Sequence, residues 1–299
     1  MLKRTAVVVV VLWCLVFWSS GAWAGAHVDM DHAGPGDKGT GILLVTFGTS
    51  IPEAQAAFTH MEEEVKAAFP DVPLRWAYTS SIIRQKLGKE GQDLDSPEVA
   101  LARMMAEGFS RVAVQSLHMI PGQEFHDVQV NVNAFKEMTD GFKKLMVGYP
   151  ALSTSEDLTK AVDALMAILP KDRKKDEAVV LMGHGTHHPS NTVYEAMMYR
   201  LQRKDPNIYM GTVEGTPTLE DIQAMLLERG VKKAYLMPFM SVAGDHTVND
   251  LVGDEPDSWK SVLTAAGIEC VPVVKGLAEY DAFADIWVDH LKVVMAHMK

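Results

Sequence analysis

From Gly41 onward the chain alternates short apolar runs with longer amphipathic stretches. Apolar runs of roughly four to eight residues, bounded by turn residues, are typical of buried strands, whereas longer amphipathic stretches predict helices. A regular alternation of the two is typical of parallel strands joined by crossover helices. The pattern therefore predicts an α/β protein, with four strand and helix units in each half of the chain.

The positions of these elements follow from the pattern. Strands are predicted over residues 42–47, 74–78, 111–117, 144–148, 178–182, 207–213, 233–238 and 268–274. Helices are predicted over residues 52–69, 97–107, 124–140, 155–169, 191–203, 218–229, 255–266 and 280–297.

The two halves also contain similar short segments in the same order. L-V-T-F-G-T-S (44–50) resembles V-L-M-G-H-G-T (180–186), and S-L-H-M-I-P-G (116–122) occupies the place of F-M-S-V-A-G (239–244). A repeat of this period indicates a duplicated unit. We therefore predict two similar lobes, residues 41–152 and 153–299, each a mostly parallel four-stranded sheet flanked by helices. The last helix is a candidate to cross back onto the first lobe.

Residues 1–24 have the three parts of a secretory signal peptide: a basic start, an apolar run and A-W-A before the expected cleavage site. A membrane anchor is the alternative, but the apolar run is shorter than the ~20 residues that a spanning helix needs. Residues 25–40 are polar and glycine-rich, which predicts a flexible leader. The expected mature protein is exported, in the periplasm or beyond, without a membrane span.

The net charge of the chain limits the classes of partner that it is expected to bind. The formal net charge is −11, and removing Lys3 and Arg4 with the signal peptide makes it −13. Nucleic acid is therefore excluded as an expected partner, because nucleic-acid-binding domains carry a basic surface. Nothing in the sequence fixes the oligomeric state, and a homo-oligomer remains compatible with it.

Three predicted strands of the second half each end next to a residue that can bind a metal ion. His184 follows the strand 178–182, Glu214 follows 207–213, and His246 follows the apolar segment that begins at residue 233. The carboxyl ends of parallel strands share one edge of a sheet. A lone His at a strand end is usually an ordinary hydrogen-bonded side chain, but three such residues at one edge predict a metal site.

Several motifs of the chain resemble those of the anaerobic cobaltochelatases, the sirohydrochlorin cobaltochelatase family of class II chelatases. They are G-H-G-T-H-H-P-S-N (183–191), G-T-V-E-G-T-P (211–217), P-F-M-S-V-A-G-D-H-T-V-N-D-L-V-G-D-E (238–255), T-F-G-T-S (46–50) and T-S-S-I-I-R-Q-K-L (79–87). The resemblance covers the chain from Gly41 to its end. It implies two α/β lobes around a cleft for a flat tetrapyrrole, insertion of a divalent ion without ATP or another nucleotide, and His184, Glu214 and His246 as catalytic and metal-binding residues.

The substrates implied by the resemblance are Co²⁺ or Fe²⁺ and a sirohydrochlorin-type tetrapyrrole. Imidazole and carboxylate ligands bind these ions without strong discrimination. An acidic protein that binds a polycarboxylate needs local donors, and we expect them among hydroxyls at helix starts and one cation: Thr49, Ser50, Ser80, Ser81 and Arg84. His126 is a candidate accessory ligand.

Two other functions use the same residues. Cobalamin synthesis belongs in the cytoplasm, so the export signal favours, as the main alternative, an exported metal or tetrapyrrole carrier with the same site. A zinc hydrolase is a weaker alternative, because the chain has no H-E-x-x-H helix and its candidate ligands follow strands.

Overall fold

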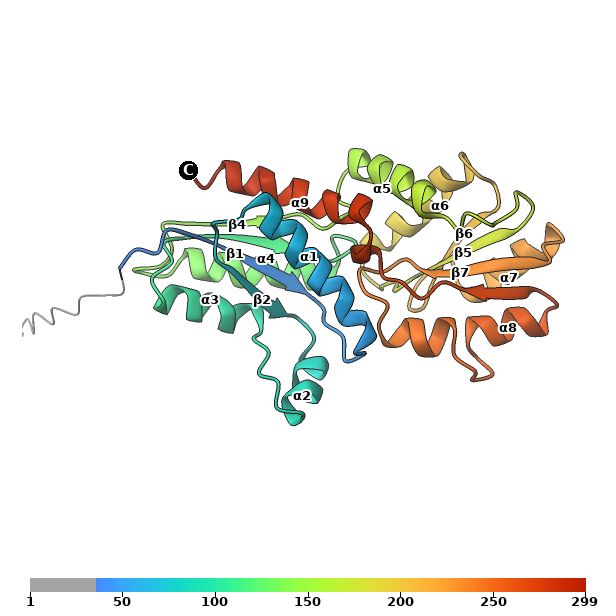
Figure 1. Cartoon of the computed structure of the whole chain (residues 1–299), viewed down its shortest axis with the longest axis horizontal. Coiled ribbons are helices and arrows are strands. Elements are labelled where there is room, and N and C mark those ends of the chain that lie inside the picture. The colour runs from blue at the N-terminus through green and yellow to red at the C-terminus, as the bar shows by residue number, and fades with distance from the viewer. Residues whose placement is uncertain (1–35) are drawn as a thin grey trace, which may run out of the picture. The chain divides into compact units, whose positions relative to one another are not determined.

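The computed structural model describes residues 36–299, and these residues form two parallel sheets with helices around them (Figure 1). The predicted signal peptide and residues 25–35 of the predicted leader lie outside this range. Within residues 36–299, no helix has the length and apolar character needed to cross a membrane.

The first lobe contains four strands in the order β2-β1-β3-β4. Its elements are β1 (Thr40–Thr46), α1 (Ala56–Ala68), β2 (Leu74–Tyr78), α2 (Ser81–Lys89), α3 (Pro97–Ala106), β3 (Arg111–Ser116), α4 (Gln123–Lys136) and β4 (Lys144–Gly148). The second lobe repeats the order as β6-β5-β7-β8. Its elements are α5 (Ser155–Ile168), β5 (Ala178–Gly183), α6 (Thr192–Gln202), β6 (Ile208–Thr212), α7 (Leu219–Glu228), β7 (Lys233–Pro238), α8 (Trp259–Ala265), β8 (Glu269–Pro272) and α9 (Asp281–Ala296).

All six strand pairings are parallel, and the identical strand orders agree with the predicted duplication. Both faces of each sheet are buried. Alternate residues of a strand point to opposite faces, so neighbouring residues of one strand belong to different apolar clusters. Ile42 and Leu44 of β1 join an apolar cluster that also contains Val179 and Leu181 of β5, so this core runs through both lobes. Leu43 of β1 joins a separate cluster on the other face of the first sheet.

The last helix, α9, crosses from the second lobe to the first. By sequence α9 belongs to the second lobe, yet it packs against β3, β4 and α1 of the first (Figure 1). Its Trp287 is fully buried, and the indole Nε1–H donates a hydrogen bond of 3.1 Å to the carbonyl of His118. The predicted second lobe, residues 153–299, is therefore contiguous in sequence while its last helix lies on the first lobe.

The strand and helix predictions agree with the structure to within a few residues, apart from three differences. Helix α2 was not among the predicted helices; Ser80 caps it by accepting a hydrogen bond from the amide of Ile83. Helix α8 begins at Trp259 rather than at residue 255, because Ser258 caps its amino end. One turn of π-helix, Thr247–Leu251, follows β7 where a loop was expected.

The predicted leader is shorter than expected at its carboxyl end. Strand β1 begins at Thr40, and the three residues before it already bond to the first lobe. Lys38 donates from its amide to the carbonyl of Gly108 at 2.9 Å, and Asp37 pairs with Lys143 at 3.0 Å. These contacts hold residues 37–39 at the amino-terminal end of the first sheet.

Candidate metal site and cleft

His184 directly follows β5, at a turn that only glycine fits well. Gly185 has φ of +78°, and a Cβ placed on it would lie 2.7 Å from the amide nitrogen of Gly215 and from Cβ of Thr212. Such a φ favours glycine because other residues are strained there. In this turn Nδ1 of His184 lies 3.0 Å from the carbonyl of Gly185. A carbonyl only accepts, so Nδ1 carries the proton and Nε2 keeps a lone pair for a metal ion.

Glu214 lies beside His184 because backbone pairing continues past the ends of β5 and β6. The amide of Val213 donates to the carbonyl of Gly183 at 3.1 Å, and the amide of Glu214 donates to the carbonyl of His184 at 2.8 Å. Oε2 of Glu214 lies 3.9 Å from Nδ1 of His184, and the side chain of Glu214 is 53% exposed. The carboxylate is therefore near the imidazole and still able to turn toward a bound ion.

His246 reaches the same place from the loop after β7. It stands at the start of the π-helical turn, which brings residues four apart onto one face. There its Nδ1 lies 2.5 Å from Oδ2 of Asp250, so Nδ1–H donates to the carboxylate. This bond fixes the ring and leaves Nε2 free, as carboxylates that accept from the other ring nitrogen do for metal-binding histidines.

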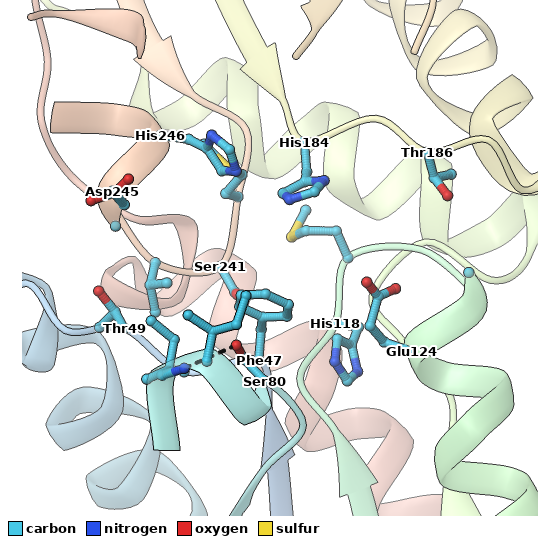
Figure 2. Close-up of a pocket in the computed structure, with 18 of the residues that line it drawn as sticks. Phe47, Thr49, Ser80, His118, Glu124, His184, Thr186, Ser241, Asp245 and His246 are labelled. Carbon is cyan, nitrogen blue, oxygen red and sulfur yellow. Dashed lines mark hydrogen bonds between the residues drawn. The ribbon is translucent and has the colours of Figure 1, made fainter. Parts of the chain in front are cut away.

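The three predicted ligands converge in the structure. One ligand atom from each of His184, Glu214 and His246 lies within 4.8 Å of the others. The two imidazole rings stand edge to face, with their centres 4.8 Å apart and the planes at 86° (Figure 2). Two neutral imidazoles and one carboxylate suit Co²⁺, Fe²⁺, Ni²⁺ or Zn²⁺. Each side chain is at least one-third exposed, so a bound ion would keep open coordination positions.

The two histidines line a cavity of about 430 Å³ between the lobes. Most of its walls come from the segments after β1 and β3 in the first lobe and after β5 and β7 in the second, and α2 adds a further part of the first-lobe wall. In each sheet these two strands are neighbours at which the chain reverses its direction of winding. Such a switch point is where open α/β sheets bind ligands. The cavity therefore lies where the two switch points meet.

The predicted substrate contacts are only partly at the cavity. Thr49, Ser50 and Ser80 line it, whereas Ser81 and Arg84 do not. The guanidinium of Arg84 turns back and donates to the carbonyls of Tyr78 and Thr79, and it borders a separate cavity of about 240 Å³. Three of the five predicted substrate contacts therefore line this cavity, and Ser81 and Arg84 lie outside its lining.

The cation that lines the cavity is Lys86, two residues further along α2 than Arg84. Its Nζ donates a hydrogen bond of 2.9 Å to Oγ of Ser50. His126 is exposed on α4 and does not line the cavity, so the structure gives no support to an accessory role there.

Two further polar residues of the first lobe face the cavity, His118 after β3 and Glu124 on α4 (Figure 2). His118 bonds to Oγ of Ser116 through Nδ1 at 2.8 Å and lies 3.4 Å from Oγ1 of Thr79 through Nε2. Burial lowers its pKa to about 4, although the nearby carboxylate of Glu124 opposes the shift. The ring of His118 is therefore neutral at pH 7 and forms part of the cavity wall.

Comparison with known proteins gives the family of the chain. Residues 40–296 match the family model described as cobalt chelatase (CbiK). The chain belongs to this family. The sirohydrochlorin cobaltochelatase CbiKC of Nitratidesulfovibrio vulgaris is 45% identical over 256 residues, 86% of this chain and 90% of the relative. The sirohydrochlorin cobaltochelatase of Salmonella typhimurium is 36% identical over 252 residues, 84% and 94% of the two chains.

Solved structures support the fold of this cobalt chelatase. SirB from Bacillus subtilis with Fe³⁺ superimposes with a TM-score of 0.57 at 14% identity, over 86% of this chain and 96% of SirB. CbiX, described as the terminal enzyme of siroheme biosynthesis in denitrifying bacteria, gives a TM-score of 0.53 at 15% identity, over 85% and 98%. At these identities the likeness concerns the fold alone, and it confirms the predicted two-lobed chelatase architecture.

Proposed function

We propose that this chain inserts Co²⁺ into a sirohydrochlorin-type tetrapyrrole without ATP, with Fe²⁺ as a second metal substrate. The observation that carries the proposal is the convergence of His184, Glu214 and His246 at a cavity between the lobes. The two relatives described above, 45% and 36% identical, are named sirohydrochlorin cobaltochelatases. This support favours a chelatase over the carrier and hydrolase alternatives.

The ligand set suits an ion that must be released again. Nε2 of each histidine and the carboxylate of Glu214 hold the ion, and the remaining positions are left for the nitrogens of the macrocycle. The carboxylate also offsets one of the two positive charges. An ion held by two neutral ligands and one anion binds less tightly than in a closed site of four ligands.

Metal insertion releases two protons from the pyrrole nitrogens, and bases in the cleft accept them. Once the ion has moved to the macrocycle, His184 and His246 are neutral imidazoles again and can each take up a proton. Glu124 offers a carboxylate on the first-lobe side of the same cavity. Bases from both lobes are therefore available to a flat substrate between them.

The substrate carries carboxylates, and the described part of the cavity offers hydroxyls and one ammonium group to hold them. Thr49, Ser50 and Ser80 lie at the starts of turns or helices, and Lys86 adds a positive charge beside Ser50. Met119 and Met240 also line the cavity and present apolar surface to a macrocycle. Polar groups near Lys86 would thus bind the substrate's rim while methionines contact its face.

The proposal is tested by measuring metal insertion into sirohydrochlorin by absorbance, with Co²⁺ and Fe²⁺ offered in turn and protoporphyrin as a second macrocycle. His184→Ala and His246→Ala are each expected to lower the rate at least a hundredfold, and Glu214→Gln to weaken metal binding. His126→Ala, exposed and away from the cavity, is the matched control. Folded His184→Ala and His246→Ala proteins that insert metal at the wild-type rate would contradict the proposal. Metal binding by the wild type without insertion would instead indicate the carrier.

We also propose that the protein is exported and cleaved after Ala24. The support is the sequence pattern alone: a basic start, an apolar run and A-W-A before Gly25. Mass spectrometry of the protein from a periplasmic fraction is expected to give an amino terminus at Gly25. Soluble protein that retains Met1 would contradict export by this signal.

A further inference from the structure

A second cluster of metal-binding side chains lies away from the cleft, where α1 meets the start of α9 (Figure 1). His60 and Glu64 are one helical turn apart on α1, and Asp281 is the first residue of α9. Nε2 of His60 lies 3.0 Å from Oδ1 of Asp281 and 3.9 Å from Oε1 of Glu64. One ligand atom from each residue lies within 4.8 Å of the others.

The tautomer of His60 is fixed by the backbone. Nδ1 lies 2.8 Å from the carbonyl oxygen of Ala278, which only accepts, so Nδ1 carries a proton. In a neutral ring Nε2 is then an acceptor that faces two acceptors, the carboxylates of Glu64 and Asp281. The contact is favourable only if a second proton or a metal ion lies between them.

The charges around the cluster favour a dication over a proton. Within residues 36–299, no Lys or Arg side chain lies within 4.0 Å of the carboxylates of Glu64 and Asp281. Lys66, the lysine of α1, pairs instead with Glu62. Protonated His60 would leave one negative charge in the cluster, whereas a divalent ion with neutral His60 leaves none. One imidazole and two carboxylates are ligands that suit Zn²⁺, Co²⁺ and Ni²⁺.

We propose that His60, Glu64 and Asp281 form a second divalent-metal site that fastens the start of α9 to α1. Asp281 is 87% exposed and Glu64 35%, so the site is open and its ion exchanges with solution. Through Ala278 the site also contacts the cleft wall. The amide of Ala278 donates to the carbonyl of Ser241 at 3.0 Å, and Ser241 lines the cavity.

The same bonding pattern occurs once more in a setting that excludes a metal, which provides a matched control. Nδ1 of His290 lies 2.9 Å from the carbonyl of Tyr149, and Nε2 lies 3.0 Å from Oδ1 of Asp157. Asp157 is buried and its other oxygen already accepts the amide of Thr154 at 2.8 Å. His290 has a single carboxylate partner and so lacks the second acidic ligand that His60 has.

The test is a Co²⁺ titration by calorimetry at pH 7.5, on full-length protein in which His184→Ala and His246→Ala have removed the cleft site. One Co²⁺ ion is expected to bind per protein molecule at this cluster. His60→Ala or Glu64→Gln is expected to weaken that binding at least tenfold. His290→Ala should leave it within twofold. The amino-terminal segment is common to all variants, so differences between them report only the cluster.

Glu64→Gln separates a metal site from a salt bridge. It retains the bonds of His60 to Ala278 and Asp281, so a purely ionic role would be little changed and the variant should fold. In crystals soaked with Co²⁺, anomalous density is expected at ~2.0 to 2.2 Å from Nε2 of His60. Cobalt binding that is unchanged in both His60→Ala and Glu64→Gln, or an absent anomalous peak at His60, would overturn the proposal. The result is independent of whether the protein inserts cobalt.

Discussion

Removing the carboxylate of Asp250 is expected to weaken cobalt binding without unfolding the protein. In the native site Nδ1–H of His246 donates to Asp250 at 2.5 Å, and this bond holds Nε2 toward His184. Asp250→Ala leaves the ring free to rotate and makes it a weaker electron donor. Asp250→Asn keeps an oxygen that accepts from Nδ1–H but removes the negative charge, so it separates orientation from charge.

The expected loss of cobalt affinity follows from the kind of bond and from the exposure of its two side chains. Losing the carboxylate partner of a metal-binding histidine typically costs roughly 10- to 100-fold in affinity or activity. The side chains of His246 and Asp250 are 34% and 44% exposed, so water screens the charge and replaces part of the lost bond. We therefore expect Asp250→Ala to weaken cobalt binding by about tenfold, or about 1.4 kcal/mol, and Asp250→Asn to weaken it less.

The assay is the dissociation constant for Co²⁺ from calorimetry together with the rate of insertion into sirohydrochlorin. Asp254→Ala is the matched control, because Asp254 lies four residues further on, is 99% exposed and pairs with Lys260. The free energy of unfolding should change little in either variant, since exposed polar side chains contribute little to stability. If folded Asp250→Ala binds and inserts cobalt within twofold of wild type, the assigned role of Asp250 is wrong.

Three other substitutions test the turn at Gly185, the cavity wall at His118 and the substrate contact at Lys86. Gly185→Ala imposes a φ of +78° and the 2.7 Å contact with Gly215, so it should lower the free energy of unfolding by about 1 to 3 kcal/mol and weaken cobalt binding, as measured by urea unfolding and calorimetry. The pKa of His118 is lowered from 6.5 to about 4 in the folded chain. Between about pH 6.5 and pH 4, the unfolded chain therefore binds a proton at His118 that the folded chain does not. The free energy of unfolding should fall over this window, by an amount on the order of 2 kcal/mol, and His118→Gln should make the fall smaller; an equal fall in both proteins would contradict the assignment. Lys86→Ala should raise KM for the tetrapyrrole about three- to tenfold with little change in kcat, whereas Lys89→Ala at the end of the same helix should leave both unchanged.

The strands and the convergence of the three candidate ligands could be predicted because they depend on local sequence. The inner strands of each sheet are apolar runs buried on both faces, and each predicted ligand follows an apolar run at a turn. Parallel topology then brings the strand ends to one edge, whatever the details of the helices. His184, Glu214 and His246 therefore converge as predicted.

The rest of the site depends on features that local sequence does not determine. Asp250 matters only because residues 247–251 form a helical turn, and T-V-N-D-L contains β-branched residues and Asn that do not predict one. Lys86 was passed over in favour of Arg84, because the sequence cannot tell which side chain of a short helix bonds to the backbone. His118 and Glu124 face the cavity only once the lobes have packed together.

The crossing of α9 explains how a cleft built from two lobes can keep its geometry. Metal ligands come from the second lobe, while His118, Glu124 and Lys86 come from the first, so their separation depends on the packing between lobes. Helix α9 continues from the second lobe and buries Trp287 against the first, where its indole bonds to the carbonyl of His118. A shift of one lobe against the other would break this bond and open the core shared by the two sheets. The cost of that shift keeps the first-lobe and second-lobe walls of the cavity at a fixed separation.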